Sequence, residues 1–212
     1  MQINQYIDHT LLSPTATLDD IKRLCQEAIE YHFYAVCVPE CYVSLARNYL
    51  TEYPIRVAAT VGFPLGSMAT ITKITQAKNC ITQGASEIDM VINIGFLKSG
   101  LDDKVEQEIA SIKKAIGDHV LKVILEISYL SNNEKQRATT LAIKAGADFI
   151  KTSTGFGSNP VTPEDIILLK EFAGTDIQIK ASGGIKDAKT AQLLIKAGAS
   201  RIGTSAGVNI VT

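Results

Sequence analysis

The chain has 212 residues, 46% of them hydrophobic, and a net charge of -1. A chain of this size can bury one large core, and no Pro-, Gly- or Ser-rich linker divides it, so we expect a single domain over residues 1–212. The near-neutral charge and the lack of a Lys/Arg run exclude the basic surface of a nucleic-acid binder, and no apolar stretch is long enough to cross a membrane. We therefore expect a cytoplasmic protein whose partner is a small molecule.

Strand and helix patterns alternate along the whole chain. Three segments share one pattern, in which a helix ends at Gly-Ala and a strand follows: Gly84-Ala85, Gly146-Ala147 and Gly198-Ala199. Glycine just past a helix adopts the left-handed conformation that turns the chain toward the next strand. Extending this reading in both directions predicts eight strands, at Tyr6–His9, Phe33–Val38, Arg56–Val61, Glu87–Asn93, Leu121–Ile127, Asp148–Ser153, Ile177–Ser182 and Ser200–Thr204.

Helical patterns separate the predicted strands, and capping sequences mark helix starts at Thr17, Ser131 and Thr162. Eight strands alternating with helices over about 200 residues predict an α/β fold, the (β/α)8 TIM barrel. A doubly wound open sheet also alternates these elements, but no Gly-x-Gly-x-x-Gly follows the first strand, and eight strands suit closure. The first strand is short, and without it the count falls to seven.

Alternate residues along each predicted strand face opposite sides of the sheet. One set is apolar, as at Ile88 and Met90, whereas the set facing the interior is largely charged. One interpretation is an internal salt-bridge network that only stabilises the barrel, with three lysines facing two carboxylates. The other is a catalytic site, because catalytic groups of such barrels lie toward the C-terminal ends of the strands. The interior set comprises Cys37, Asp89, Lys122, Glu126, Lys151 and Lys180.

Lys151 and Lys180 favour the catalytic interpretation. A buried ammonium group costs several kcal/mol unless it is paired or loses its proton, and these amines would lie on neighbouring strands, roughly 5–10 Å apart. Their repulsion favours loss of a proton from one of them, and a neutral lysine amine can form a Schiff base with a carbonyl compound. Asp89 could exchange protons, or could hold one lysine charged so that the other is neutral.

Glycine-rich loops follow the last three predicted strands, with Gly155 after Lys151, Gly183-Gly184 after Lys180, and Gly203 to Gly207 at the end. Any one of them could be an ordinary turn. Glycines let backbone N–H groups approach an anion, however, and the loops after strands 7 and 8 are the usual phosphate site of this fold. We therefore expect a ligand that carries both a phosphate and a carbonyl group.

Short motifs along nearly the whole chain resemble, in the same order, those of the deoxyribose-phosphate aldolase family. The most specific is Lys-Thr-Ser-Thr-Gly at Lys151–Gly155. Members of the family are (β/α)8 barrels that use no metal or cofactor and interconvert 2-deoxy-D-ribose 5-phosphate with acetaldehyde and D-glyceraldehyde 3-phosphate. The other matching motifs are Asp8–Thr10, Ala35–Pro39, Glu87–Val91, Leu121–Glu126, Lys180–Ile185 and Gly203–Ser205.

The resemblance implies a role for each matching residue. Lys151 is implied to be the Schiff-base lysine, Lys180 the lysine that tunes it, and Asp89 the acid/base partner. The resemblance also implies a homodimer. The residues implied to bind the substrate are Asp8, Thr10, Cys37, Lys122, Gly155, Gly183, Gly184, Gly203 and Ser205.

Two departures from the family pattern concern phosphate binding and proton transfer. Phe156 stands where some members have a lysine, which leaves phosphate binding to backbone amides, glycines and Ser205. The sequence ends at Thr212 without the C-terminal tyrosine that some members use in proton transfer, so another donor or water would act there.

Two other functions share parts of this pattern. Another phosphosugar barrel enzyme, such as an isomerase or a transaldolase-like enzyme, would have the phosphate loops but would not need both lysines. A non-catalytic phosphosugar-binding protein would use the interior charges only to hold the barrel together, and a tuned lysine pair argues against it.

Overall fold

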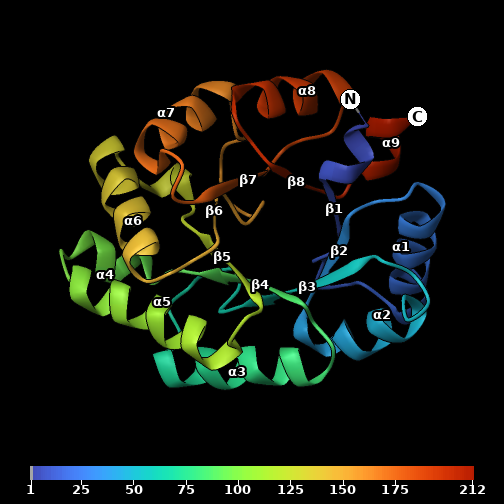
Figure 1. Ribbon diagram of the computed structural model, residues 1–212, viewed down its shortest axis with the longest axis horizontal. Coiled ribbons are helices and arrows are strands. Elements are labelled where there is room, and N and C mark those ends of the chain that lie inside the picture. Colours follow the sequence, from blue (N-terminus) through green and yellow to red (C-terminus); the bar gives the residue numbers. More distant parts are fainter. Residues whose placement is uncertain (1) are drawn as a thin grey trace.

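The strands close into one parallel barrel, which confirms the predicted (β/α)8 fold (Figure 1). The computed structural model describes residues 2–212. Each strand pairs with the next one along the chain, and the last returns to the first, with Asp8 opposite Gly203. The strands are β1 (Ile7–Thr10), β2 (Ala35–Val38), β3 (Arg56–Val61), β4 (Glu87–Val91), β5 (Val120–Ile124), β6 (Phe149–Lys151), β7 (Gln178–Ser182) and β8 (Arg201–Thr204).

Helices surround the barrel (Figure 1). The three predicted capping sites are confirmed, since Thr17, Ser131 and Thr162 each form a capping box with the acidic residue three positions later. The helices are α1 (Leu18–Glu30), α2 (Val43–Tyr49), α3 (Thr70–Thr82), α4 (Ile94–Lys98), α5 (Asp102–Ile116), α6 (Asn132–Lys144), α7 (Pro163–Ala173), α8 (Ala188–Ala197) and α9 (Gly207–Val211). Short 3-10 turns lie at η1 (Ile3–Tyr6), η2 (Glu40–Tyr42) and η3 (Ile127–Tyr129).

Three strands end earlier than the sequence pattern predicts, and β6 is one of them, since it stops at Lys151 instead of Ser153. β4 stops at Val91, because the side chain of Asn93 accepts a hydrogen bond from the amide of Phe96 and caps the helix that follows. β5 stops at Ile124, because Glu126 adopts a left-handed conformation with φ of 55°. Apolar periodicity cannot predict the ends of β4 and β5, since each of them depends on a single polar residue.

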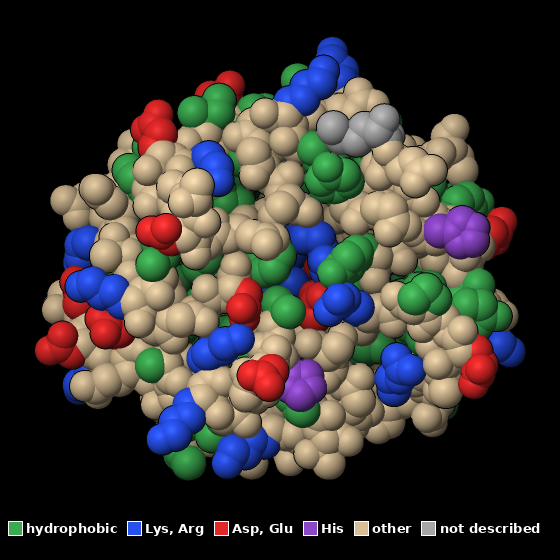
Figure 2. Space-filling model, viewed as in Figure 1, with side chains coloured by type: hydrophobic (Ala, Val, Ile, Leu, Met, Phe, Trp, Pro, Cys, Tyr) green, Lys and Arg blue, Asp and Glu red, His purple; other side chains and the backbone are tan. Residues whose placement is uncertain are grey.

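The apolar and charged residues occupy different layers. Outward-facing side chains such as Val36, Ile88 and Met90 are fully buried in the hydrophobic core between strands and helices. The barrel interior is charged instead, and Figure 2 shows basic and acidic side chains together at the centre of the face viewed along the barrel. No helix in the described part of the chain is long and apolar enough to span a membrane.

Candidate active site

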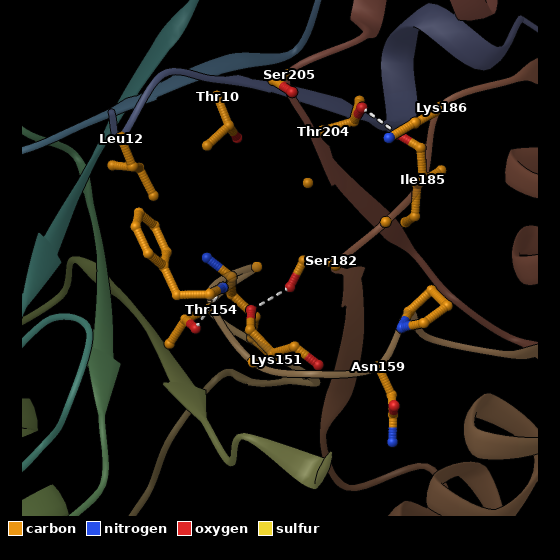
Figure 3. A pocket seen from close by; sticks show the side chains of 18 of the residues that line it. Thr10, Leu12, Lys151, Thr154, Asn159, Ser182, Ile185, Lys186, Thr204 and Ser205 are labelled. Carbon is orange, nitrogen blue, oxygen red and sulfur yellow. Dashed lines mark hydrogen bonds between the residues drawn. The ribbon is translucent and has the colours of Figure 1, made fainter. Parts of the chain in front are cut away.

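A cavity of about 820 Å³ opens at the C-terminal ends of the strands, walled by the loops that follow β1, β6, β7 and β8. Figure 3 shows Lys151 and Ser182 on one side of this cavity, with Thr10, Thr204 and Ser205 across from them. The cavity therefore lies at the end of the barrel where the loops of this fold assemble active sites.

Asp89 joins the three buried lysines of the barrel interior. Its Oδ2 atom lies 2.9 Å from Nζ of Lys151 and 2.8 Å from Nζ of Lys180, and its Oδ1 atom lies 2.7 Å from Nζ of Lys122. None of these four side chains is more than 2% exposed. Strand register produces the cluster, since Lys151 is the direct neighbour of Lys180 and Asp89 is the direct neighbour of Lys122. The Lys151 and Lys180 amines thus share one carboxylate oxygen.

More charges lie toward the N-terminal ends of the strands. Arg201 bonds to Asp8 and Glu87, each at 2.9 Å, while Lys180 also bonds to Asp8 and Lys122 also bonds to Glu87. Including Lys151 and Asp89, the interior network holds four cations and three carboxylates, an excess of one positive charge when all are ionised. Glu126 was expected in this network, and that expectation was wrong. Its carboxylate instead accepts hydrogen bonds from Thr154, on the loop after β6.

The network fixes the ionisation of most of its members. Burial by itself would lower the pKa of Lys180, but the facing carboxylates of Asp8 and Asp89 outweigh burial and raise this pKa above its usual range. Burial would raise the pKa of Asp89, but Lys122, Lys151 and Lys180 lower it well below its usual value. In the same way, cations that outweigh burial lower the pKa of Asp8 to about 2. Lys180 therefore stays an ammonium between two carboxylates.

Lys151 differs from the other two lysines in position and in pairing. It alone of the three lines the cavity. Among the residues described, Asp89 is the only carboxylate within salt-bridge distance of its amine, whereas Lys122 reaches three and Lys180 reaches two. Lys151 is therefore the interior amine that a small molecule in the cavity can reach.

The glycines of the last loops line the same cavity as Lys151. Gly183 and Gly184 have φ of 100° and 75°, values that residues with a Cβ adopt only under strain. Gly203 serves a different purpose, since a Cβ there would lie 3.0 Å from Cε of Lys180 and 3.1 Å from Cβ of Ser182. The glycine at this position leaves room for the lysine stem to cross the barrel.

The structure divides the residues selected from sequence into two groups. Thr10, Lys151, Gly155, Gly183, Gly184, Gly203 and Ser205 line the cavity, whereas Asp8, Cys37, Asp89, Lys122 and Lys180 are fully buried and are not part of its lining. Cys37 contacts the network, with its Sγ atom 3.9 Å from Oδ2 of Asp89. The pKa of its thiol is raised, mainly by burial.

Sequence reasoning missed three charged residues of the site. Glu87 and Arg201 are the first residues of β4 and β8, where an exposed polar residue is common. Each lies two positions before a residue that faces the barrel interior, so alternation directs its side chain inward as well. Lys186 is the only cation besides Lys151 in the described cavity lining, and it directly follows the Gly183-Gly184-Ile185 turn. Its position next to a predicted phosphate loop was a signal that could have identified it.

Together the fold and the cavity define a (β/α)8 barrel enzyme in which one lysine amine, that of Lys151, lines a cavity walled by glycine loops. The family model described as "DeoC/LacD family aldolase" matches residues 3–212. The chain belongs to this aldolase family.

Proteins with similar sequences match this chain over almost its full length. A deoxyribose-phosphate aldolase of Caldanaerobacter subterraneus subsp. tengcongensis is 50% identical, covering 100% of this chain and 93% of that protein. One from Coprothermobacter proteolyticus is 47% identical, covering 100% and 96%. Among solved structures, the tetrameric deoxyribose phosphate aldolase of Aeropyrum pernix superposes with a TM-score of 0.90 at 31% identity, covering 99% of this chain and 89% of that one.

Proposed function

We propose that the protein catalyses the reversible cleavage of 2-deoxy-D-ribose 5-phosphate to acetaldehyde and D-glyceraldehyde 3-phosphate through a Schiff base on Lys151. The observation that carries this proposal is the shared carboxylate oxygen. Asp89 Oδ2 accepts a hydrogen bond from Lys151 and another from Lys180, whose pKa is raised by its two carboxylate partners. With Lys180 held as the cation, the excess positive charge of the network is relieved by deprotonation of Lys151.

The first half of the reaction joins the substrate to the enzyme. The neutral Nζ atom of Lys151 attacks the C1 aldehyde of the open-chain sugar, and the carbinolamine that forms loses its hydroxyl as water to give an iminium ion. Asp89 lies within hydrogen-bond distance of both Lys151 and Lys180, and so Asp89 and Lys180 together can deliver and accept the protons that these steps exchange.

The second half breaks the bond between C2 and C3, as a two-carbon and a three-carbon product require. A base removes the proton of the C3 hydroxyl, C3 becomes the aldehyde of glyceraldehyde 3-phosphate, and the bonding electrons move into the iminium to form an enamine. Protonation of the enamine at C2 and hydrolysis release acetaldehyde and the free amine of Lys151. Asp89, acting through Lys180 or a water molecule, is the proposed base.

The phosphate is proposed to bind at the far end of the cavity from Lys151. Backbone amides near Gly183, Gly184 and Ser205 are available there, and Lys186 supplies a positive charge. This arrangement accounts for the absence of a lysine at position 156, where the aromatic ring of Phe156 packs edge-on against Phe63 with ring centroids 5.4 Å apart. Three residues implied to bind the substrate are buried outside the cavity lining, namely Asp8, Cys37 and Lys122. We propose that they act indirectly, by fixing the positions of Asp89 and Lys180.

Borohydride trapping tests the central step. Reduction in the presence of 2-deoxyribose 5-phosphate should leave a stable adduct on Lys151, identified by peptide mass spectrometry, and a Lys151→Leu variant should show neither adduct nor cleavage. Lys144 is a matched control, since its variant Lys144→Leu lies outside the cavity, on α6, and should behave as wild type. Cleavage by the Lys151→Leu variant, or an adduct on Lys180 alone, would contradict the mechanism.

The same trapping experiment addresses the two other functions suggested by the sequence. A barrel isomerase would convert a phosphosugar without any borohydride-dependent adduct, and a non-catalytic binding protein would bind it without turnover.

We further propose that the protein is a cytoplasmic, single-domain homodimer, as the family resemblance implies. The relative from Aeropyrum pernix is described as tetrameric, so light scattering of the purified protein is the measurement that decides the oligomeric state.

A further inference from the structure

Glu126 is a buried carboxylate that the proposed reaction does not use. Its side chain is 2% exposed and does not line the cavity. The amides on either side of it continue the pairing with the end of β6, since Leu125 N donates to Lys151 O and Ile127 N donates to Thr152 O, both at 3.0 Å. Glu126 between them adopts φ of 55°, a conformation rare for residues with a side chain. Such backbone conformations are enriched at functional sites, where the surrounding structure holds them in place.

The carboxylate of Glu126 holds the start of the loop 154–160, which follows β6. Its Oε2 atom accepts a hydrogen bond from the backbone amide of Thr154 at 3.2 Å and another from the Thr154 hydroxyl. The same hydroxyl oxygen accepts a hydrogen bond from the amide of Phe156 at 3.0 Å. One carboxylate oxygen thereby fixes the first three residues of the loop.

The second carboxylate oxygen of Glu126 lies close to the loop at Gly157. Oε1 of Glu126 is buried and has no hydrogen-bond partner among residues 2–212, and neither has Oγ of Ser128. A Cβ placed on Gly157 would lie 3.0 Å from this Oε1 atom and 2.8 Å from Oγ of Ser128. A larger residue at position 157 would therefore force the loop or these two side chains to shift.

The far end of the loop is attached to the glycine turn of the proposed phosphate site. Val161 N donates to Gly183 O at 3.1 Å, and a Cβ on Gly184 would lie 2.5 Å from Cβ of Pro160. Every residue from Thr154 to Pro160 lines the cavity. The loop is therefore held at one end by Glu126 and at the other by the turn that would bind phosphate.

We propose that Glu126 is a positioning residue which, through Thr154, sets the loop 154–160 and so the affinity of the cavity for the phosphate-bearing end of the substrate. It acts on binding rather than on the chemistry at Lys151, because its carboxylate touches the loop and none of the lysines. The identity of the ligand in this inference rests on the proposed function. The attachment of the loop to Glu126 does not depend on that function.

Substitutions on both sides of the contact test the proposal. Glu126→Ala and Thr154→Val each remove the hydrogen bond that joins the side chains, and each should raise KM for 2-deoxyribose 5-phosphate about tenfold, the value of one hydrogen bond to a charged group, with kcat within about twofold. Gly157→Ala should raise KM in the same way by lifting the loop. Glu126→Gln should restore binding, because its carbonyl oxygen can still accept both hydrogen bonds. The matched control Glu171→Gln removes an exposed carboxylate on α7 and should leave KM unchanged.

Two measurements separate this role from a general loss of structure. Borohydride trapping of acetaldehyde, which lacks a phosphate, should be as fast in Glu126→Ala as in wild type. Hydrogen exchange of the amides of residues 154–160 should be faster in Glu126→Ala and unchanged elsewhere in the barrel. An unchanged KM for the phosphorylated substrate, or equal losses in acetaldehyde trapping and in phosphosugar cleavage, would overturn the role in binding.

Failure of the proposed function would look different. If wild type neither cleaves 2-deoxyribose 5-phosphate nor traps acetaldehyde, the aldolase mechanism is wrong. The exchange measurement still decides whether Glu126 holds the loop, because faster exchange in Glu126→Ala supports the attachment and unchanged exchange refutes it.

Discussion

The Oδ2 atom of Asp89 lies 2.9 Å from the Nζ atom of Lys151, at the junction between the charged barrel interior and the open cavity. Asp89 is fully buried, and its pKa is lowered because the surrounding lysines outweigh the effect of burial. An anion so placed can hold the neighbouring ammonium groups and exchange a proton with Lys151. The position of Asp89 therefore links the electrostatics of the interior to the reactive amine.

Replacing Asp89 with asparagine removes the negative charge of this side chain but keeps its shape. The variant leaves four interior cations facing two carboxylates, and it removes the proposed base. We expect kcat for cleavage of 2-deoxyribose 5-phosphate to fall by about 10²- to 10³-fold, in the range of general acid–base catalysis. Steady-state kinetics provide the measurement, and Asp103→Asn, on the exposed side of α5, is the control. A kcat within twofold of wild type in Asp89→Asn would rule out the catalytic role.

Replacing Lys180 with methionine should change the pH dependence of the reaction. Lys180 stays an ammonium because its carboxylate partners outweigh burial and raise its pKa. Its removal takes away the cation that shares Oδ2 of Asp89 with Lys151. The loss of this positive charge favours the ammonium form of Lys151 and hence a slower Schiff-base reaction at neutral pH. We expect the rise of kcat/KM with pH to move to more alkaline values, and Lys196→Met, on the exposed side of α8, to leave it in place. A profile that falls in amplitude without moving would mean that Lys180 does not control the charge of Lys151.

Lys186 should contribute to phosphate binding. It lines the cavity beside the glycine turn, and Phe156 occupies the position where some family members carry a lysine. We expect Lys186→Gln to raise KM for 2-deoxyribose 5-phosphate several-fold, with a smaller dependence of KM on salt, because one charge contact with the phosphate is lost. The nearby Lys189→Gln variant, exposed and outside the cavity, is the control. The KM for unphosphorylated 2-deoxyribose should not change, and an equal rise for both sugars would contradict the assignment.

The sequence predicted those parts of the site that depend on strand order and side-chain alternation. Lys151 and Lys180 were expected to be neighbours because their strands are consecutive, and the strand register places them side by side. Their roles could not be derived in the same way. Which lysine remains charged depends on Asp8, which reaches Lys180 from the other end of the chain, across 172 positions of sequence. No local pattern records a contact of that kind.

Other features depended on single residues whose environment the sequence does not reveal. Glu126 has the alternation expected of an interior residue, but its left-handed backbone directs its carboxylate to Thr154 instead. Lys73 looks like an exposed helical lysine, yet it is fully buried and its amine lies 2.8 Å from Oε2 of Glu108 on the next long helix. Helical periodicity predicts which face is buried, but it does not identify the partner that makes a buried charge tolerable.

Asp8 should make the stability of the protein depend on acid pH. Its pKa in the folded protein is about 2, against an ordinary value of 3.8, because Lys180, Arg201 and Lys122 outweigh the effect of burial. As the pH falls, the unfolded chain takes up this proton before the folded protein does. The contribution of Asp8 is therefore complete above about pH 4 and is lost as the pH falls toward 2, an effect on the order of 2 kcal/mol.

Urea unfolding of wild type and Asp8→Asn at pH 7 and at pH 3 measures this contribution. Asp8→Asn should already be destabilised at pH 7, by about 3–5 kcal/mol, since it leaves buried cations without a partner. The difference between the two proteins should then shrink at pH 3, because wild type loses the stabilisation that the variant never had. Asp176→Asn, exposed before β7, should follow wild type at both pH values. A difference between wild type and Asp8→Asn that is the same at pH 7 and at pH 3 would mean that Asp8 does not carry a lowered pKa in the folded protein.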